Sequence, residues 1–175
     1  SRGLGDVYKR QIVFTIVSII EVIMVRRHIV RVYQAVAILF LLTFVAIVYA
    51  STVFTRNPLP YAQYQLKPFW SYKYILAENR FFMKECFLNF LLLMPVGILL
   101  PYVFDRKIKW WQGLMCGIIL SGGIEVLQLV LRRGLFEWDD IFHNSLGCML
   151  TTIIGSRIYL IIMKIKSRIN KKFKF

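Results

Sequence analysis

Several long stretches of this sequence are apolar enough to cross a lipid bilayer. A membrane-spanning helix needs about 20 consecutive, mostly apolar residues. The stretches of that length are residues 35–54, 86–104, 110–131 and 141–163. Within them, Glu125 and Arg157 are the only Asp, Glu, Lys or Arg residues. A shorter stretch, residues 12–25, indicates a truncated first span. The sequence therefore predicts an all-α, polytopic membrane helix bundle with about five transmembrane helices.

The composition excludes other broad classes of protein. Apolar residues make up 58% of the chain and charged residues 18%, whereas soluble domains average about 45–50% and about 25%. Disorder is excluded because disordered segments have low hydrophobicity. A soluble monomer is disfavoured because too few polar residues remain to cover its surface. The three cysteines are an odd number, which argues against a disulfide framework.

The basic residues predict how the chain is oriented in the membrane. The net charge of +14 would suggest nucleic-acid binding in a soluble protein. Here the basic residues lie between and after the apolar stretches, so we expect lipid contacts and no nucleic acid. Twelve of them fall in segments 26–33, 105–109 and 164–175, against seven in the opposite connections. The positive-inside rule then places the C-terminus in the cytoplasm and the N-terminus outside, with anionic lipid at the basic tail.

The sequence divides into four parts. Residues 1–11, SRGLGDVYKRQ, resemble the translated end of a sequencing adapter, so we expect them to be an artefact and the native N-terminus to be missing. Residues 12–34 contain the truncated first span and a cytoplasmic loop. Residues 35–163 form the main membrane domain. Residues 164–175 form the basic cytoplasmic tail.

Polar residues gather at the predicted outer ends of three spans. Glu125, Gln128 and Arg132 share one helix face because they are three and seven residues apart. Asp140 and Asn144 lie one turn apart on the last span. An ionisable group inside a membrane costs roughly 2.5–3.5 kcal/mol, so each is a functional candidate by default. The candidate ligand-binding residues are Asn89, Glu125, Gln128, Arg132, Arg133, Glu137, Asp139, Asp140 and Asn144.

A structural role would also explain these residues. Glu125 would pair with Arg132 or Asn144 and fasten the bundle. Asp139 and Asp140 would cap the last helix, because carboxylates favour a helix N-terminus. The chain has no metal-ligand spacing and no Ser–His pair. We therefore expect no metal site and no cofactor.

Three motifs occur in chain order across the spans. They are Asn89 with Pro95 and Gly97, then Glu125-x-x-Gln128, then Phe136-Glu137-Trp138-Asp139-Asp140 with Asn144 and Gly147. Together they resemble the VanZ-like family of bacterial membrane proteins over roughly residues 35–163. Pro68 and Phe69 are similar to a Pro-Phe element of that family. The chain departs from the pattern at Glu137, where Asp is usual.

The resemblance implies a multi-pass protein of the bacterial cell envelope. The family's namesake is associated with low-level resistance to the glycopeptide antibiotic teicoplanin. We hypothesise that the candidate residues bind a lipid-linked or cell-wall-related precursor at the outer leaflet. Arg132 or Arg133 would meet its phosphate or carboxylate. Glu125, Asp139 and Asp140 would accept hydrogen bonds from its hydroxyl or amide groups.

Other functions are compatible with the same residues. In a membrane-embedded enzyme, Glu125, Asp139 and Asp140 would be the catalytic acid–base groups. In a small transporter subunit, Glu125 would relay protons, and so few spans would require a homo-oligomer. A purely structural partner protein would need none of this chemistry.

Overall fold

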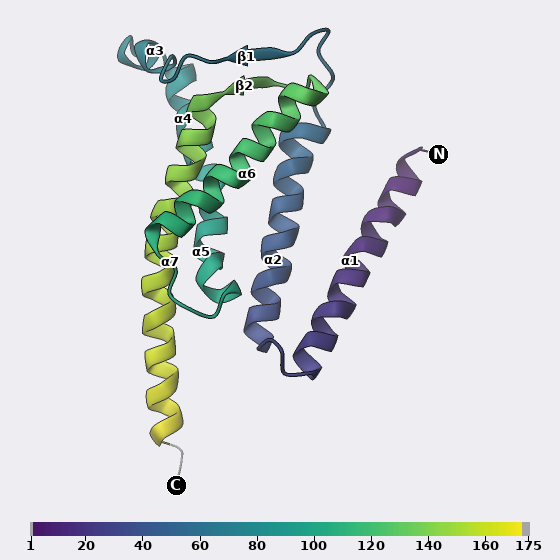
Figure 1. Ribbon diagram of the computed structural model, residues 1–175, viewed down its shortest axis with the longest axis vertical. Coiled ribbons are helices and arrows are strands. Elements are labelled where there is room, and N and C mark those ends of the chain that lie inside the picture. The colour runs from purple at the N-terminus through teal and green to yellow at the C-terminus, as the bar shows by residue number, and fades with distance from the viewer. Residues whose placement is uncertain (1, 173–175) are drawn as a thin grey trace.

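The computed structural model describes residues 2–172 as a bundle of long helices with two short strands across one end (Figure 1). The elements are α1 (Arg2–Arg26), α2 (Val32–Tyr49), the π-helical turn η1 (Ala50–Phe54), β1 (Gln63–Gln65), α3 (Tyr72–Leu76), α4 (Arg80–Leu92), α5 (Met94–Val103), α6 (Trp110–Leu131), β2 (Leu135–Glu137) and α7 (Trp138–Lys172).

Four helical segments in the described part of the chain are long and apolar enough to cross a membrane. They are Val32–Phe54 in α2 and η1, Arg80–Val103 in α4 and α5, Trp110–Leu131 in α6, and Trp138–Lys171 in α7. The predicted all-α membrane bundle is thereby confirmed. Residues 12–25 belong to α1, which is not among the four because Lys9, Arg10 and Glu21 limit its apolar run.

The second of these segments is interrupted at Leu93, as its proline predicts. Pro95 lies in the first turn of α5 and has no N–H to donate to the preceding turn. Leu93 accordingly leaves helical geometry, with φ −101° and ψ 8°. The interruption separates α4 from α5 and lets both halves follow α7.

Helix α7 is the central element of the bundle, because α4, α5 and α6 all pack against it. Small residues permit these close contacts. A Cβ added at Gly113 would lie 2.6 Å from Cβ of Thr152, and one at Gly117 would lie 2.6 Å from Cα of Ser145. A Cβ at Gly147 would overlap the carbonyl oxygen of Phe90 in α4.

The two ends of the bundle differ in structure and charge. At one end lie the α1–α2 and α5–α6 connections and the last turns of α7, so the three basic segments share that end, as expected (Figure 1). Within the described residues the basic tail is no separate segment, since α7 continues to Lys172. At the other end, β1 pairs in parallel with β2, with Tyr64 opposite Phe136. This pairing could not be predicted from the sequence, because three-residue strands have no measurable periodicity.

We predict that Gly147→Ala will lower the Tm of the purified protein in detergent. Overpacking a tight helix contact costs about 1–3 kcal/mol. Gly122→Ala is the matched control on α6, because nothing lies within 4 Å of a Cβ there. It should leave the Tm unchanged or raise it slightly, since alanine favours helix. Equal Tm values for the two variants would contradict the close α4–α7 contact.

Candidate functional site

Five of the predicted site residues come together at the end of the bundle that carries β1 and β2. We call this group the polar cluster; it consists of Asn89, Glu125, Glu137, Asp140 and Asn144. Three helices and one strand supply these residues, namely α4, α6, β2 and α7. Glu125 and Asn144 are each only 2% exposed, and Glu137 is 8% exposed.

The carboxylate of Glu125 binds the start of the last helix segment. The backbone N–H of Glu137 donates to Glu125 Oε2 over 2.9 Å. The N–H belongs to the last residue of β2, directly before α7 begins. Glu125 therefore joins α6 to the β2–α7 junction, and the predicted pairing with Arg132 or Asn144 is wrong. Its second oxygen accepts no protein hydrogen bond within the described residues.

Asp140 connects α7 to α4. Asn89 Nδ2 donates to Asp140 Oδ1. One turn further along α7, Asn144 Nδ2 donates to Ser121 Oγ over 2.8 Å. Ser121 Oγ lies 3.4 Å from the carbonyl oxygen of Asp140, to which it donates. The amide oxygen of Asn144 is buried and has no protein partner among the described residues.

Asp139 makes different contacts from its neighbour Asp140. Asp139 is 2% exposed, whereas Asp140 is half-buried. Its Oδ1 accepts the backbone N–H of Phe69 over 2.6 Å. Its Oδ2 accepts the Ser71 hydroxyl over 2.6 Å and the Ser71 N–H over 3.3 Å. Asp139 thus holds the loop before α3 against α7. The expected helix-capping role of Asp139 and Asp140 is therefore replaced by contacts to the loop and to α4.

Gln128, Arg132 and Arg133 point away from the polar cluster. They donate respectively to the carbonyl oxygens of Thr52, Pro60 and Phe54, over 3.1, 3.3 and 2.5 Å. Arg132 adopts a left-handed conformation with φ 55° where α6 ends. These three side chains fasten the end of α6 to the chain that follows α2. Within the described side chains, neither Arg132 nor Arg133 forms an ion pair with a carboxylate.

Sequence reasoning missed several residues around the polar cluster. The guanidinium of Arg56 lies beside Gly134, where an added Cβ would be 3.0 Å from its Nη1. Its positive charge is within electrostatic range of Glu125 and Asp140. In the sequence, Arg56 was only one of several basic residues in a connection between spans, so nothing linked it to the polar cluster. Ser71 gave no signal at all, because its role depends on where the loop folds.

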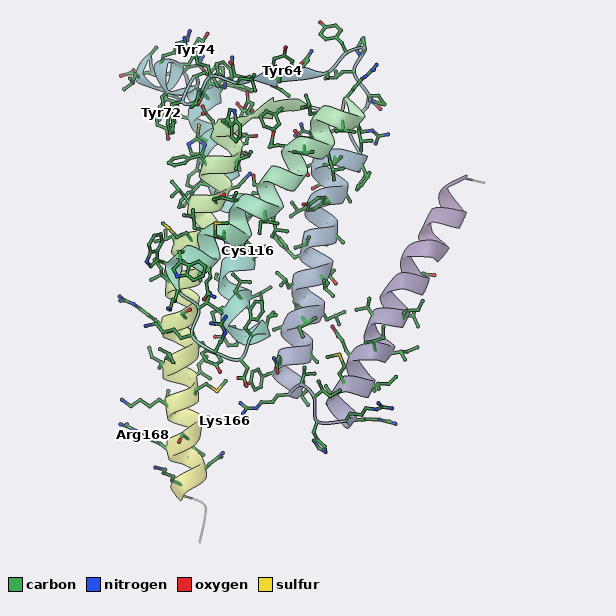
Figure 2. The ribbon with its side chains drawn as sticks, viewed as in Figure 1. Tyr64, Tyr72, Tyr74, Cys116, Lys166 and Arg168 are labelled. Atoms are coloured by element: carbon green, nitrogen blue, oxygen red, sulfur yellow. The ribbon has the colours of Figure 1, made fainter. Side chains whose placement is uncertain are left out.

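Aromatic side chains surround this end of the bundle. Figure 2 shows Tyr64, Tyr72 and Tyr74 there, around β1 and α3. The Tyr72 hydroxyl lies 3.0 Å from Nε2 of His143, and the two rings stack. Tyrosine and tryptophan favour the membrane–water boundary. Their gathering is consistent with a polar cluster at that boundary.

Burial perturbs the one cluster carboxyl that lies outside the membrane-spanning segments. Burial first, and then the negative charges of Asp140, Glu85 and Asp139, raise the pKa of Glu137 to about 7. Glu137 therefore exchanges its proton near neutral pH. Among the residues whose side chains the structure describes, no group of three or more His, Cys, Asp and Glu is arranged to hold a metal ion.

The fold and the polar cluster define a polytopic α-helical membrane protein with buried carboxyl groups at one end. A family model described as VanZ/LLP1 matches residues 32–162, and the chain belongs to this family. The match covers all four apolar segments almost completely. Comparisons with curated proteins and with solved structures found no match.

We predict that Glu137 makes the folded protein less stable as pH rises from about 5 to about 8. The folded state keeps the Glu137 proton up to a pKa of about 7, whereas an unperturbed glutamate loses it near 4.5. The folded state therefore binds more protons than the unfolded state across this window, and stability falls with rising pH. Thermal unfolding in detergent should show this decline, and Glu137→Gln should reduce it. An unchanged pH profile in the variant would refute the assignment.

Proposed function

We propose that the protein binds the polar part of a lipid-linked or cell-wall-related molecule at the polar cluster. The observation that carries this proposal is an excess of buried and half-buried acceptors over donors, with Glu125 and Asn144 buried and Asp140 half-buried. Glu125 and Asp140 each accept a single side-chain or backbone hydrogen bond, and the Asn144 amide oxygen accepts none. Buried acceptors without partners are costly, so native structures rarely leave them unpaired. A ligand rich in hydroxyl, amide or amine groups would supply the missing donors.

The surroundings of the polar cluster favour a ligand that is partly apolar. Trp138 lies between Glu137 and Asp139 in the sequence and is 46% exposed. Phe69, held next to α7 by Asp139, is 50% exposed. Such rings can cover a sugar or a lipid segment, while carboxyl groups bind its polar atoms. Any phosphate of the ligand would meet Arg56, because Arg132 and Arg133 already donate to backbone carbonyls.

Binding should depend on the carboxyl groups of Glu125 and Asp140. The protein in nanodiscs would be titrated with a polyprenyl-linked cell-wall precursor and, separately, with teicoplanin. Glu125→Gln and Asp140→Asn keep the size of each side chain but replace one carboxyl oxygen by an amide NH2 group. A ligand donor left without its acceptor costs about 1–3 kcal/mol, so each variant should weaken binding about fivefold or more.

Glu78→Gln is the matched control for this titration. Glu78 is an exposed carboxylate at the same end of the bundle, between α3 and α4. Its replacement should leave the affinity unchanged. If neither molecule binds, or if binding is equal in all three variants, the proposed function is wrong. A response to teicoplanin alone would favour a role in glycopeptide resistance.

We propose further that the protein lies in a bacterial cell membrane with the polar cluster facing outward and the C-terminus in the cytoplasm. The larger group of basic residues at the opposite end supports this orientation. Two single cysteines, Tyr64→Cys and Lys107→Cys, can be placed in a background without native cysteines. Both positions are exposed, at opposite ends of the bundle. An impermeant thiol reagent should label whole cells at position 64 only. Labelling at position 107 only would show that the protein has the opposite orientation.

A membrane-embedded enzyme is the second candidate, and the pKa of Glu137 favours it. A general acid or base works best when its pKa lies near the operating pH. Glu137, with a pKa of about 7, fits this role better than Asp139, which holds a loop. In the same nanodisc assay, product formation that is lost in Glu137→Gln while binding persists would identify an enzyme.

A further inference from the structure

The end of the bundle opposite to the polar cluster carries a second, basic site. An open cavity of about 430 Å³, lined mostly by exposed side chains, lies there between the start of α2 and the last turns of α7. Its lining residues are Arg31, Met163, Lys166, Ser167, Asn170 and Lys171. None of these six is acidic, and three are cationic. The volume falls within the range of about 300–1,000 Å³ that is usual for small-molecule sites.

Two of the cations are held in place by the ring of Tyr33. The guanidinium of Arg31 lies 6.0 Å from the ring centroid, and Nζ of Lys166 lies 5.5 Å from it. Arg31 Nη1 also donates to the Tyr33 hydroxyl over 2.9 Å. Because Tyr33 belongs to α2 and Lys166 to α7, these contacts bring together residues 133 positions apart in the sequence. The positive charges are therefore positioned in advance of any ligand.

Asp105 contacts both Arg31 and Tyr33 and stabilises their positions. Its Oδ2 lies 3.1 Å from Arg31 Nη1, and its Oδ1 accepts the Tyr33 hydroxyl and, over 2.6 Å, the Tyr159 hydroxyl. These two tyrosine hydrogen bonds lower the pKa of Asp105, so it stays ionised. Asp105 offsets one positive charge and does not line the cavity. Lys166 and Lys171 have no carboxylate partner within the described residues.

Two of the membrane-spanning segments have their ends beside the cavity. Arg31 directly precedes the apolar segment Val32–Phe54, and Asp105 follows the segment Arg80–Val103 by two residues. Phosphate groups of a bilayer occupy this boundary, and basic side chains there attract anionic lipid. Met163 adds an apolar wall to the cavity. A phospholipid fits both the cations and the apolar wall, since its phosphate is linked through glycerol to apolar acyl chains.

We propose that this cavity is a discrete binding site for the phosphate headgroup of an anionic phospholipid. The site differs from a diffuse basic surface because its cations come from two distant segments and share one aromatic ring. Figure 2 shows Lys166 on the side of α7 that faces α2, and Arg168 on the opposite side. The same helix therefore carries a lysine inside the site and an arginine outside it.

Retention of phosphatidylglycerol measures this site directly. The protein would be reconstituted in phosphatidylcholine nanodiscs with a rising share of phosphatidylglycerol, and native mass spectrometry would count the lipid that remains bound. A headgroup-level basic residue is worth about fivefold in affinity. Lys166→Gln and Lys171→Gln should each weaken retention by about this factor. Arg168→Gln should leave it almost unchanged.

Several controls make the result decisive. Equal losses for Lys166→Gln and Arg168→Gln would overturn the proposal, because they would show attraction by overall charge. Retention of phosphatidylcholine equal to that of phosphatidylglycerol would overturn it too. Displacement of the lipid by inorganic phosphate at comparable concentration would assign the site to free phosphate. Lys171 is not one of the two cations near the Tyr33 ring. A loss of retention in Lys171→Gln therefore reports lost lipid binding and not a disturbed contact between α2 and α7. Asp140→Asn should not alter lipid retention, which keeps this test independent of the polar cluster.

Discussion

The absence of water inside a bilayer is the constraint on which this structure depends, because every buried polar group must then find a partner within the protein. Helix α7 meets this constraint along most of its length. Asp140 accepts from α4, Asn144 donates to α6, and Ser156 both accepts from and donates to the backbone of Ile108 over 3.1 Å. These polar contacts, together with glycine at the closest approaches, make α7 the helix around which the bundle is built.

The same constraint explains why the two ends of the bundle have different chemistry. At one end carboxyl and amide groups are buried under β1 and β2, and they outnumber their donors. At the other end, the carboxylate of Asp105 accepts hydrogen bonds from two tyrosines and pairs with Arg31. Lys166 and Lys171 have no acidic partner within the described residues. The two ends therefore differ in chemistry, with acceptors in excess at one end and cations in excess at the other.

Much of the arrangement could be predicted from sequence. The apolar stretches predicted the third span with its observed bounds and the first to within three residues. The second begins six residues earlier than predicted and the fourth ends eight residues later, because helix continues through polar residues there. Pro95 predicted that the second span would be interrupted near Leu93. The three- and four-residue spacings placed Asn89, Glu125, Asp140 and Asn144 at one depth, and the structure brings them together. Spacing could not show that Arg132 and Arg133 turn toward the loop after α2, because long side chains reach whichever acceptor the fold places nearby.

The sequence alone determined that this chain spans a membrane as helices and that its polar residues lie at one end, since hydrophobicity and helical periodicity are local properties of the chain. Only the tertiary structure decided that Asp139 holds a loop while Asp140 joins another helix. Adjacent residues on a helix point about 100° apart, so their partners depend on which elements pack on each side. The same holds for Arg31 and Lys166, whose shared contact with Tyr33 exists only because the start of α2 lies within side-chain reach of the last turns of α7.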